Sequence, residues 1–125
     1  IANVYYGIDE DSKIYFISPL DAKHSKQILA DSSIAFSVAW YNPQDYADRK
    51  AVQGLGVCRI AKNILEIGKG VMLHNQNFPV FAKKITFEWI RTNAWKSRVW
   101  VVEPKYMKFW NDELYKEEES EEFNL

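Results

Sequence analysis

Alternation of apolar and polar residues is the clearest signal along this chain, and it predicts strands. Residues Ile34–Tyr41 alternate without a break, with isoleucine, phenylalanine, valine and tryptophan on one side. Asn3–Ile8 alternates in the same way, and Lys13–Ser18 returns after the polar turn Asp9–Ser12, which predicts a β-hairpin. A long strand is expected over Ala51–Ala61. The pattern therefore indicates a mainly β protein.

Fewer segments have helical spacing. A helix is predicted over Ala22–Ala30 with Asp21 as its N-cap, and a second over Ile64–His74. Val80–Ile90 fits both the strand and the helix period, and we interpret it as helical. The segment Asn42–Lys50 contains Asn-Pro and several charges, which favours a loop.

Pro104 divides the last apolar segment of the chain, and acidic residues follow that segment. Arg98–Glu103 and Tyr106–Trp110 are predicted as two closing strands on either side of this proline. The acidic residues that follow favour a disordered tail over 116–125. We therefore expect one domain over residues 1–115, a small antiparallel barrel with helices packed outside it.

Composition narrows the functional classes. The chain has 125 residues, 47% of them hydrophobic and 26% charged, which is typical of one globular domain. A net charge of −1 argues against a nucleic-acid partner, and no apolar run is long enough to span a membrane. The single cysteine, Cys58, cannot form an internal disulfide, so we expect a cytoplasmic protein. Because the chain starts at Ile1 without an initiator methionine, we expect an N-terminal segment before it.

The junction between the second strand and the first helix offers the best candidate chemistry. A strand ending at Ser18 runs into a helix that opens with Lys23, His24 and Ser25. Backbone N–H groups, a lysine, a histidine and two hydroxyls would then point at one small volume, which predicts an anion site. The two histidines, His24 and His74, have no carboxylate at ligand spacing, so no metal site is predicted. The sequence identifies no catalytic residue.

The order of six features resembles the pyridoxamine 5'-phosphate oxidase-like, FMN-binding split barrels. These features are the hairpin VYYGIDEDSKIYFIS, the helix start AKHSKQI, the strands IAFSVAW and AVQGLGVCRI, a helix running into Phe78-Pro79, and the closing segment VWVVEPKYMKFW. The resemblance implies a six-stranded antiparallel split β-barrel of Greek-key type. It also implies a homodimer that holds FMN between its two subunits.

The resemblance assigns the phosphate end of the cofactor to the same junction. Ile17 and Ser18 occupy the strand end that touches flavin and phosphate in the family, and Lys23 with His24 occupies the place of its basic pair. A lysine suits phosphate as a point charge. His24 departs from the family pattern, which usually has a second arginine or lysine, so a weaker and pH-dependent site is expected.

Two further residues are implied as contacts of the flavin ring. Gln53 stands near the family's polar contact to the ring, and Trp110 is the tryptophan placed to stack near it. The end of the chain departs from the true oxidases, because acidic residues follow Trp110 where those enzymes carry arginines that grip the substrate phosphate. We therefore reject oxidation of pyridoxamine phosphate as the activity.

Two functions remain open at this point. The first is an FMN-dependent oxidoreductase acting on an unidentified small molecule, in which the flavin supplies the chemistry. The second is a non-enzymatic cofactor-binding or sensing module on the same barrel, since one fold hosts many functions. Deazaflavin and haem stay open as alternatives to FMN.

Overall fold

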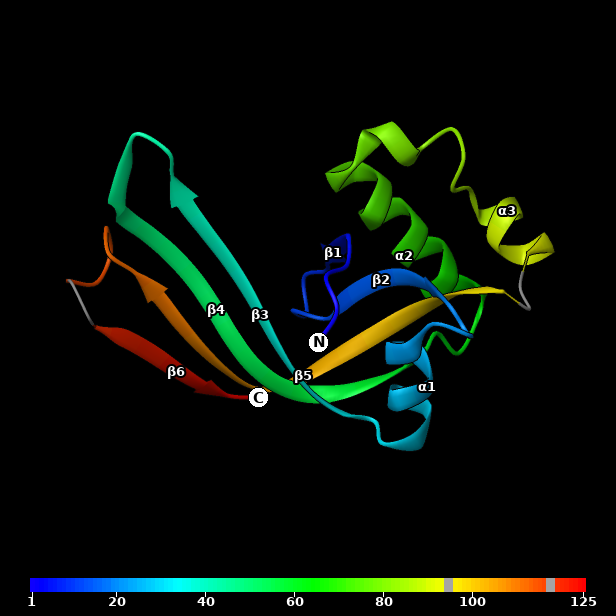
Figure 1. The fold of residues 1–125 in the computed structure, drawn as a ribbon, viewed down its shortest axis with the longest axis horizontal. Coiled ribbons are helices and arrows are strands. Elements are labelled where there is room, and N and C mark those ends of the chain that lie inside the picture. The colour runs from blue at the N-terminus through cyan, green and yellow to red at the C-terminus, as the bar shows by residue number, and fades with distance from the viewer. Residues whose placement is uncertain (94–95, 117–118) are drawn as a thin grey trace. The chain divides into compact units, whose positions relative to one another are not determined.

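The structure is a computed structural model that describes residues 1–93, 96–116 and 119–125. Its described strands form one antiparallel sheet in the order β1-β2-β5-β4-β3, with β6 paired to β5, so the predicted mainly β split-barrel fold class is confirmed. The elements, shown in Figure 1, are β1 (Tyr6–Ile8), β2 (Ile14–Pro19), α1 (Lys23–Ala30), β3 (Ser33–Asn42), β4 (Asp45–Ile60), α2 (Ile64–Asn77), the 3₁₀ helix η1 (Pro79–Phe81), α3 (Phe87–Thr92), β5 (Ser97–Asn111) and β6 (Ser120–Asn124).

The chain divides into two compact units. Unit 1 joins Ile1–Ser32 to Cys58–Glu103, and unit 2 joins Ser33–Val57 to Pro104–Leu125. The long strands β4 and β5 each contribute residues to both units. The predicted domain boundary at residue 115 falls inside unit 2.

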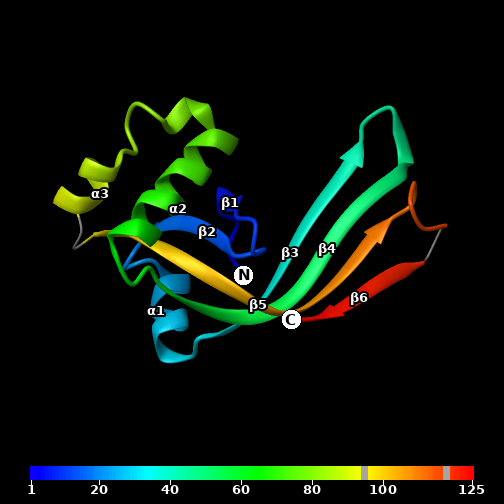
Figure 2. The ribbon, with the colours of Figure 1, turned by 180° about the vertical axis from the view of Figure 1, so that it is seen from behind.

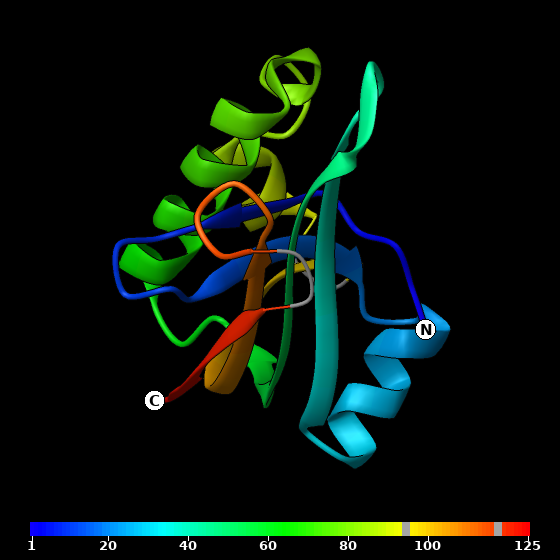
Figure 3. The ribbon, with the colours of Figure 1, turned by 90° about the vertical axis from the view of Figure 1, so that its left-hand side faces the viewer.

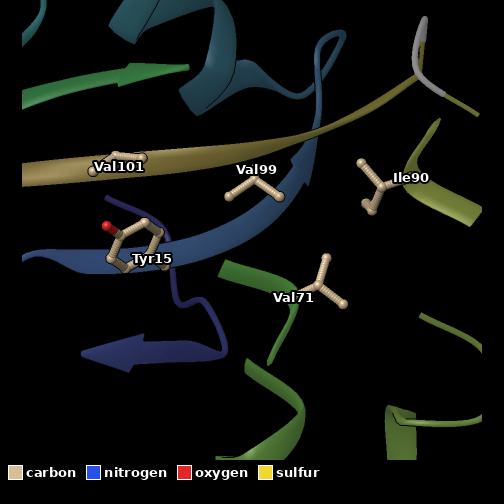
Figure 4. Close-up of a cluster of buried hydrophobic side chains, with 5 residues drawn as sticks. All are labelled: Tyr15, Val71, Ile90, Val99 and Val101. Carbon is tan, nitrogen blue, oxygen red and sulfur yellow. The ribbon is translucent and has the colours of Figure 1, made fainter. Parts of the chain in front are cut away.

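The core of unit 1 lies between the strands β2 and β5 and the helices α2 and α3 (Figure 4). Val99 and Val101 of β5 are almost completely buried, and each such side chain stabilises the fold by about 1.5–3 kcal/mol. α2 approaches closely at Gly70, where a Cβ would meet Val99 and would lie 3.1 Å from Cδ1 of Tyr15. The five buried residues of the cluster are Tyr15, Val71, Ile90, Val99 and Val101.

The opposite side of β2 packs against α1. Figures 1 and 2 show α1 and α2 on opposite sides of the β2–β5 pair. Phe16 is buried there and stacks on Trp100, with ring centroids 6.2 Å apart and planes 9° from parallel. The Trp100 indole Nε1 donates to the Ser18 carbonyl at 3.1 Å. This packing fixes the end of β2 where the chain turns into α1.

Unit 2 consists, in its described residues, of strands and turns without a helix; its pairs β3–β4 and β5–β6 can be followed in Figure 3. β3 contains the predicted strand Ile34–Tyr41 and pairs Phe36 with Gly54. A Cβ on Gly54 would meet the Phe36 ring and would lie 2.8 Å from the Tyr106 carbonyl oxygen. The glycine therefore accommodates the protein's own side chain and backbone.

Several element boundaries differ from the sequence predictions. The predicted loop Asn42–Lys50 is mostly strand, because a two-residue turn at Pro43-Gln44 connects β3 to β4. The two predicted closing strands are one strand, β5, which continues through the buried Pro104. The predicted helix Val80–Ile90 is replaced by η1, a turn and α3, which Thr86 caps.

The acidic tail also differs from the prediction of disorder. Ser120–Asn124 forms β6, which pairs Phe123 with Met107 of β5. The Glu122 carboxylate lies 3.7 Å from the Lys108 ammonium, so at least one acidic residue of the tail has a cation opposite it. The predicted tail also includes residues 117–118, which lie outside the described residues.

No described helix has the length and apolar character needed to cross a bilayer.

Candidate functional site

The end of β2 and the first turn of α1 are held together by a side-chain hydrogen bond. The buried Ser18 has its Oγ 2.7 Å from Nε2 of His24. The Ala22 N–H donates to the Pro19 carbonyl at 3.3 Å, which closes the connecting turn. The structure therefore brings together the side chains of Ser18 and His24, two of the residues predicted to bind the cofactor phosphate, and Lys23 precedes His24 in the same turn.

The first turn of α1 has no side-chain cap. Its N-cap is Ala22, which has extended backbone angles, so the prediction of Asp21 as N-cap was wrong by one residue. The first turn also contains no acidic residue. Backbone N–H groups at an uncapped helix start carry partial positive charge and lack intrahelical acceptors, which favours an anion there.

Ser25 supplies the second unusual feature of this turn. Its side chain is completely buried, and its Oγ has no hydrogen-bond partner in the described part of the chain. Burying an unsatisfied hydroxyl costs about 1–3 kcal/mol, so such a group needs an explanation. The sequence placed Ser25 in the first turn but gave no signal that its hydroxyl is buried and unpaired.

The remaining predicted residues of this junction differ in what they offer. The Lys23 side chain is exposed, so its ammonium can reach a ligand at the surface. Ile17 packs its side chain against the core cluster of unit 1, opposite Val99 in the β2–β5 ladder. The Ile17 side chain therefore contributes to packing in unit 1.

Unit 2 contains a second candidate site, a hollow of about 390 Å³. It brings together Gln53 and Trp110, the two predicted ring contacts. It also contains Arg49, whose Nε donates to Oδ2 of Asp112 at 3.1 Å. Sequence reasoning missed this ion pair, because the two residues are 63 positions apart and belong to no motif. The lining residues are Arg49, Ala51, Gln53, Trp110 and Asp112.

The other chemically reactive side chains are placed for packing. Burial raises the pKa of the Cys58 thiol to about 12, which leaves it protonated and unreactive at neutral pH. His74 is buried among aromatic rings, with Phe81 and Phe78 at centroid distances of 5.6 and 5.8 Å. Within the described ranges, no three His, Cys, Asp or Glu residues are grouped so that they could hold a metal ion.

Comparison with solved structures identifies the fold. A heme binding protein from Mycobacterium smegmatis matches 97% of this chain with a TM-score of 0.73 and 13% identity, although the chain spans only 45% of that protein. A NimC/NimA family protein from Clostridium acetobutylicum matches 95% of the chain and 70% of its own length (TM-score 0.61, 13% identity). A pyridoxamine 5'-phosphate oxidase-related, FMN binding protein from Nostoc punctiforme matches 98% and 77% (TM-score 0.52, 11% identity).

The chain has the split-barrel fold. No protein-family model matches the sequence, and no curated protein matches it. Identities this low establish the shared split barrel and leave the ligand of this chain to be argued from its own residues.

Proposed function

We propose that this split-barrel protein binds FMN and acts as a flavin-dependent oxidoreductase on a small molecule. The observation that carries the proposal is the first turn of α1, where the helix has no side-chain cap and the buried Ser25 hydroxyl has no described partner. A phosphate at this turn would accept hydrogen bonds from the free N–H groups and from Ser25. The FMN binding protein from Nostoc punctiforme, with the same fold, supports the choice of ligand.

Lys23, Ser18 and His24 would each contribute to phosphate binding in a different way. Lys23 contributes a positive charge from the exposed side of the turn, and Ser18 holds His24 in place through the 2.7 Å contact. A neutral His24 can donate one hydrogen bond, so its Nε2–H would be directed to Ser18 or to the phosphate. Bound FMN would supply hydride or electron transfer, while the protein supplies position.

The proposal extends to assembly, location and substrate. We infer a homodimer in the cytoplasm, in keeping with the implied subunit arrangement and the single cysteine. Pyridoxamine phosphate is not the expected substrate, because the last strand, β6, carries Glu121 and Glu122 where a phosphate clamp needs arginines. Competition between FMN and a ligand of the unit 2 hollow tests the ring contacts predicted for Gln53 and Trp110.

FMN titration by flavin fluorescence tests the phosphate site. Lys23→Ala should weaken binding about ten- to hundredfold, because it removes one charge-assisted contact. Lys26→Ala is the matched control, since Lys26 is exposed on the same helix but lies beyond its first three residues. Equal dissociation constants for these two variants and the wild type would overturn the site.

Ser25→Ala gives a sharper signature, because two measurements should move in opposite directions. Removing an unsatisfied buried hydroxyl should raise the stability of the FMN-free protein by about 1–3 kcal/mol. The same change should weaken FMN binding, since the phosphate loses a donor. Weaker binding together with lower stability would instead indicate a general packing defect.

Spectra of the loaded protein separate the alternative functions. A flavin absorbance that is bleached by NAD(P)H supports the oxidoreductase. Flavin binding without reduction by any donor supports the cofactor-binding or sensing module. A Soret band after titration with haemin, with no flavin binding, would place this chain with the heme binding protein of the same fold.

A further inference from the structure

The hollow in unit 2 contains Arg49, which is held by hydrogen bonds to Asp112 and keeps part of its guanidinium exposed to solvent. Arg49 Nε donates to Asp112, and the Asp112 N–H donates to the Arg49 carbonyl at 3.2 Å, so backbone and side chain are both held. The Arg49 side chain is 61% exposed, whereas that of Asp112 is 11% exposed. The two terminal nitrogens of the guanidinium make no hydrogen bond with the described residues. They form a pre-oriented pair of donors that faces solvent.

The other walls of the hollow suit a flat ring. Trp110 is partly buried, lines the hollow and has the Lys108 ammonium 5.1 Å from its ring centroid, and the lining residue Ala51 adds a small apolar side chain. The exposed Gln53 adds an amide that makes no hydrogen bond within the described part of the chain. A volume of about 390 Å³ lies in the range of small-molecule sites.

Neighbouring charges favour a ligand with a single negative charge. Lys108 and Lys50 already face carboxylates, at 3.7 Å from Glu122 and 3.0 Å from Glu113. Among the described lining residues, Arg49 is the cation, and neither lysine lines the hollow. Because Asp112 lies beside it, a dianionic phosphate would be repelled more strongly than a carboxylate, whose planar shape matches the guanidinium.

We propose that this hollow binds a small aromatic carboxylate. Its carboxylate accepts hydrogen bonds from the terminal nitrogens of Arg49, its ring lies against Trp110 and Ala51, and Gln53 bonds a ring substituent. This assigns Gln53 and Trp110 to a second ligand in place of the flavin ring. The proposal does not depend on FMN binding at α1.

Binding of 2-naphthoate to the full chain, followed by calorimetry, tests the proposal. Arg49→Gln should weaken binding about ten- to hundredfold, while Arg91→Gln, which alters another exposed arginine in an ion pair, should leave it unchanged. Trp110→Leu should weaken binding about tenfold, and Trp40→Leu, which alters an exposed tryptophan that also has a lysine over its ring, should not. Circular dichroism checks that each variant is folded.

Four results would overturn the proposal. The first is absence of 2-naphthoate binding, and the second is equal affinity of the Arg49→Gln and Arg91→Gln variants. The third is equal affinity for the uncharged 2-naphthamide, which would show that no carboxylate contact exists. The fourth is competitive displacement of 2-naphthoate by FMN, which would return the hollow to the cofactor. Arginine-dependent binding in a protein that does not bind FMN would support this inference while refuting the proposed function.

Discussion

Gly54 and Gly68 lie in regular elements but have opposite surroundings. A Cβ at Gly54 would meet the Phe36 ring and lie 2.8 Å from a backbone oxygen, whereas a Cβ at Gly68 would meet nothing within 4 Å. Gly54→Ala should therefore destabilise the protein by about 1–3 kcal/mol through overpacking. Gly68→Ala should stabilise it by about 0.5–1 kcal/mol, because alanine favours a helix interior. Urea denaturation measures both, and similar changes in the two variants would contradict these contacts.

Also at the residue scale, Glu66 makes stability depend on acid pH. Its carboxylate accepts two hydrogen bonds from Arg59, at 2.8 and 2.9 Å, and this pairing lowers its pKa from 4.5 to about 2. The stabilisation is complete above pH 4.5 and is lost as the pH falls towards 2. Glu66→Gln should lower the stability by about 1–3 kcal/mol at pH 7 and by much less near pH 2. Thermal unfolding across this range checks the convergence, and a constant difference would contradict it.

At the scale of elements, the two longer helices begin differently. α2 is capped by Asn63, whose Oδ1 accepts the Glu66 N–H at 3.0 Å, while α1 begins at Ala22 without a side-chain cap. Ala22→Asp should add a cap and stabilise the FMN-free protein by about 0.5–2 kcal/mol. The same carboxylate should weaken FMN binding, because it competes for the same N–H groups. Ala82→Asp, at an exposed position outside α1, is the control for the added charge. Unchanged FMN affinity in Ala22→Asp would argue against phosphate at this helix.

Local patterns predicted the elements where one period dominates. The alternation of Ile34–Tyr41 gave β3 within one residue at each end, and the helix expected over Ala22–Ala30 is α1. The missed boundaries depend on pairing between distant strands. Asp45 extends β4 because Asn42 pairs with it across a tight turn, and Pro104 is tolerated inside β5 although proline usually ends a central strand. Single-sequence patterns contain neither fact.

The candidate sites show the same limit. The junction residues Ser18, Lys23 and His24 are close in sequence, so the local pattern and the resemblance were enough to group them. Arg49 and Asp112 come together only because β4 and β5 continue into unit 2, and nothing in either segment indicates a partner. Burial of the Ser25 hydroxyl also depends on tertiary packing.

At the scale of the whole molecule, the partly exposed apolar face of β3 in unit 2 indicates that the protein forms a dimer. Ile34, Phe36 and Val38 are only partly buried on one face of β3, and Trp40 is 49% exposed. A sheet buries its apolar face against a second layer, and unit 2 has no helix among its described residues to provide one. We therefore expect a dimer, with a mass of about 29 kDa, twice the 14.7 kDa of one chain. Light scattering at micromolar concentration measures it, and a mass near 15 kDa would contradict the dimer.

The lone thiol has a practical consequence. Cys58 is 2% exposed, and its N–H donates to the Ser32 carbonyl at 2.8 Å, at the point where β4 passes from unit 2 into unit 1. A reagent such as an aromatic disulfide can modify the thiol only after Cys58 and Ser32 separate, since the folded protein keeps the thiol buried and protonated. The rate at which Cys58 is labelled therefore measures how often β4 opens locally at this position. This measurement separates local opening from global unfolding.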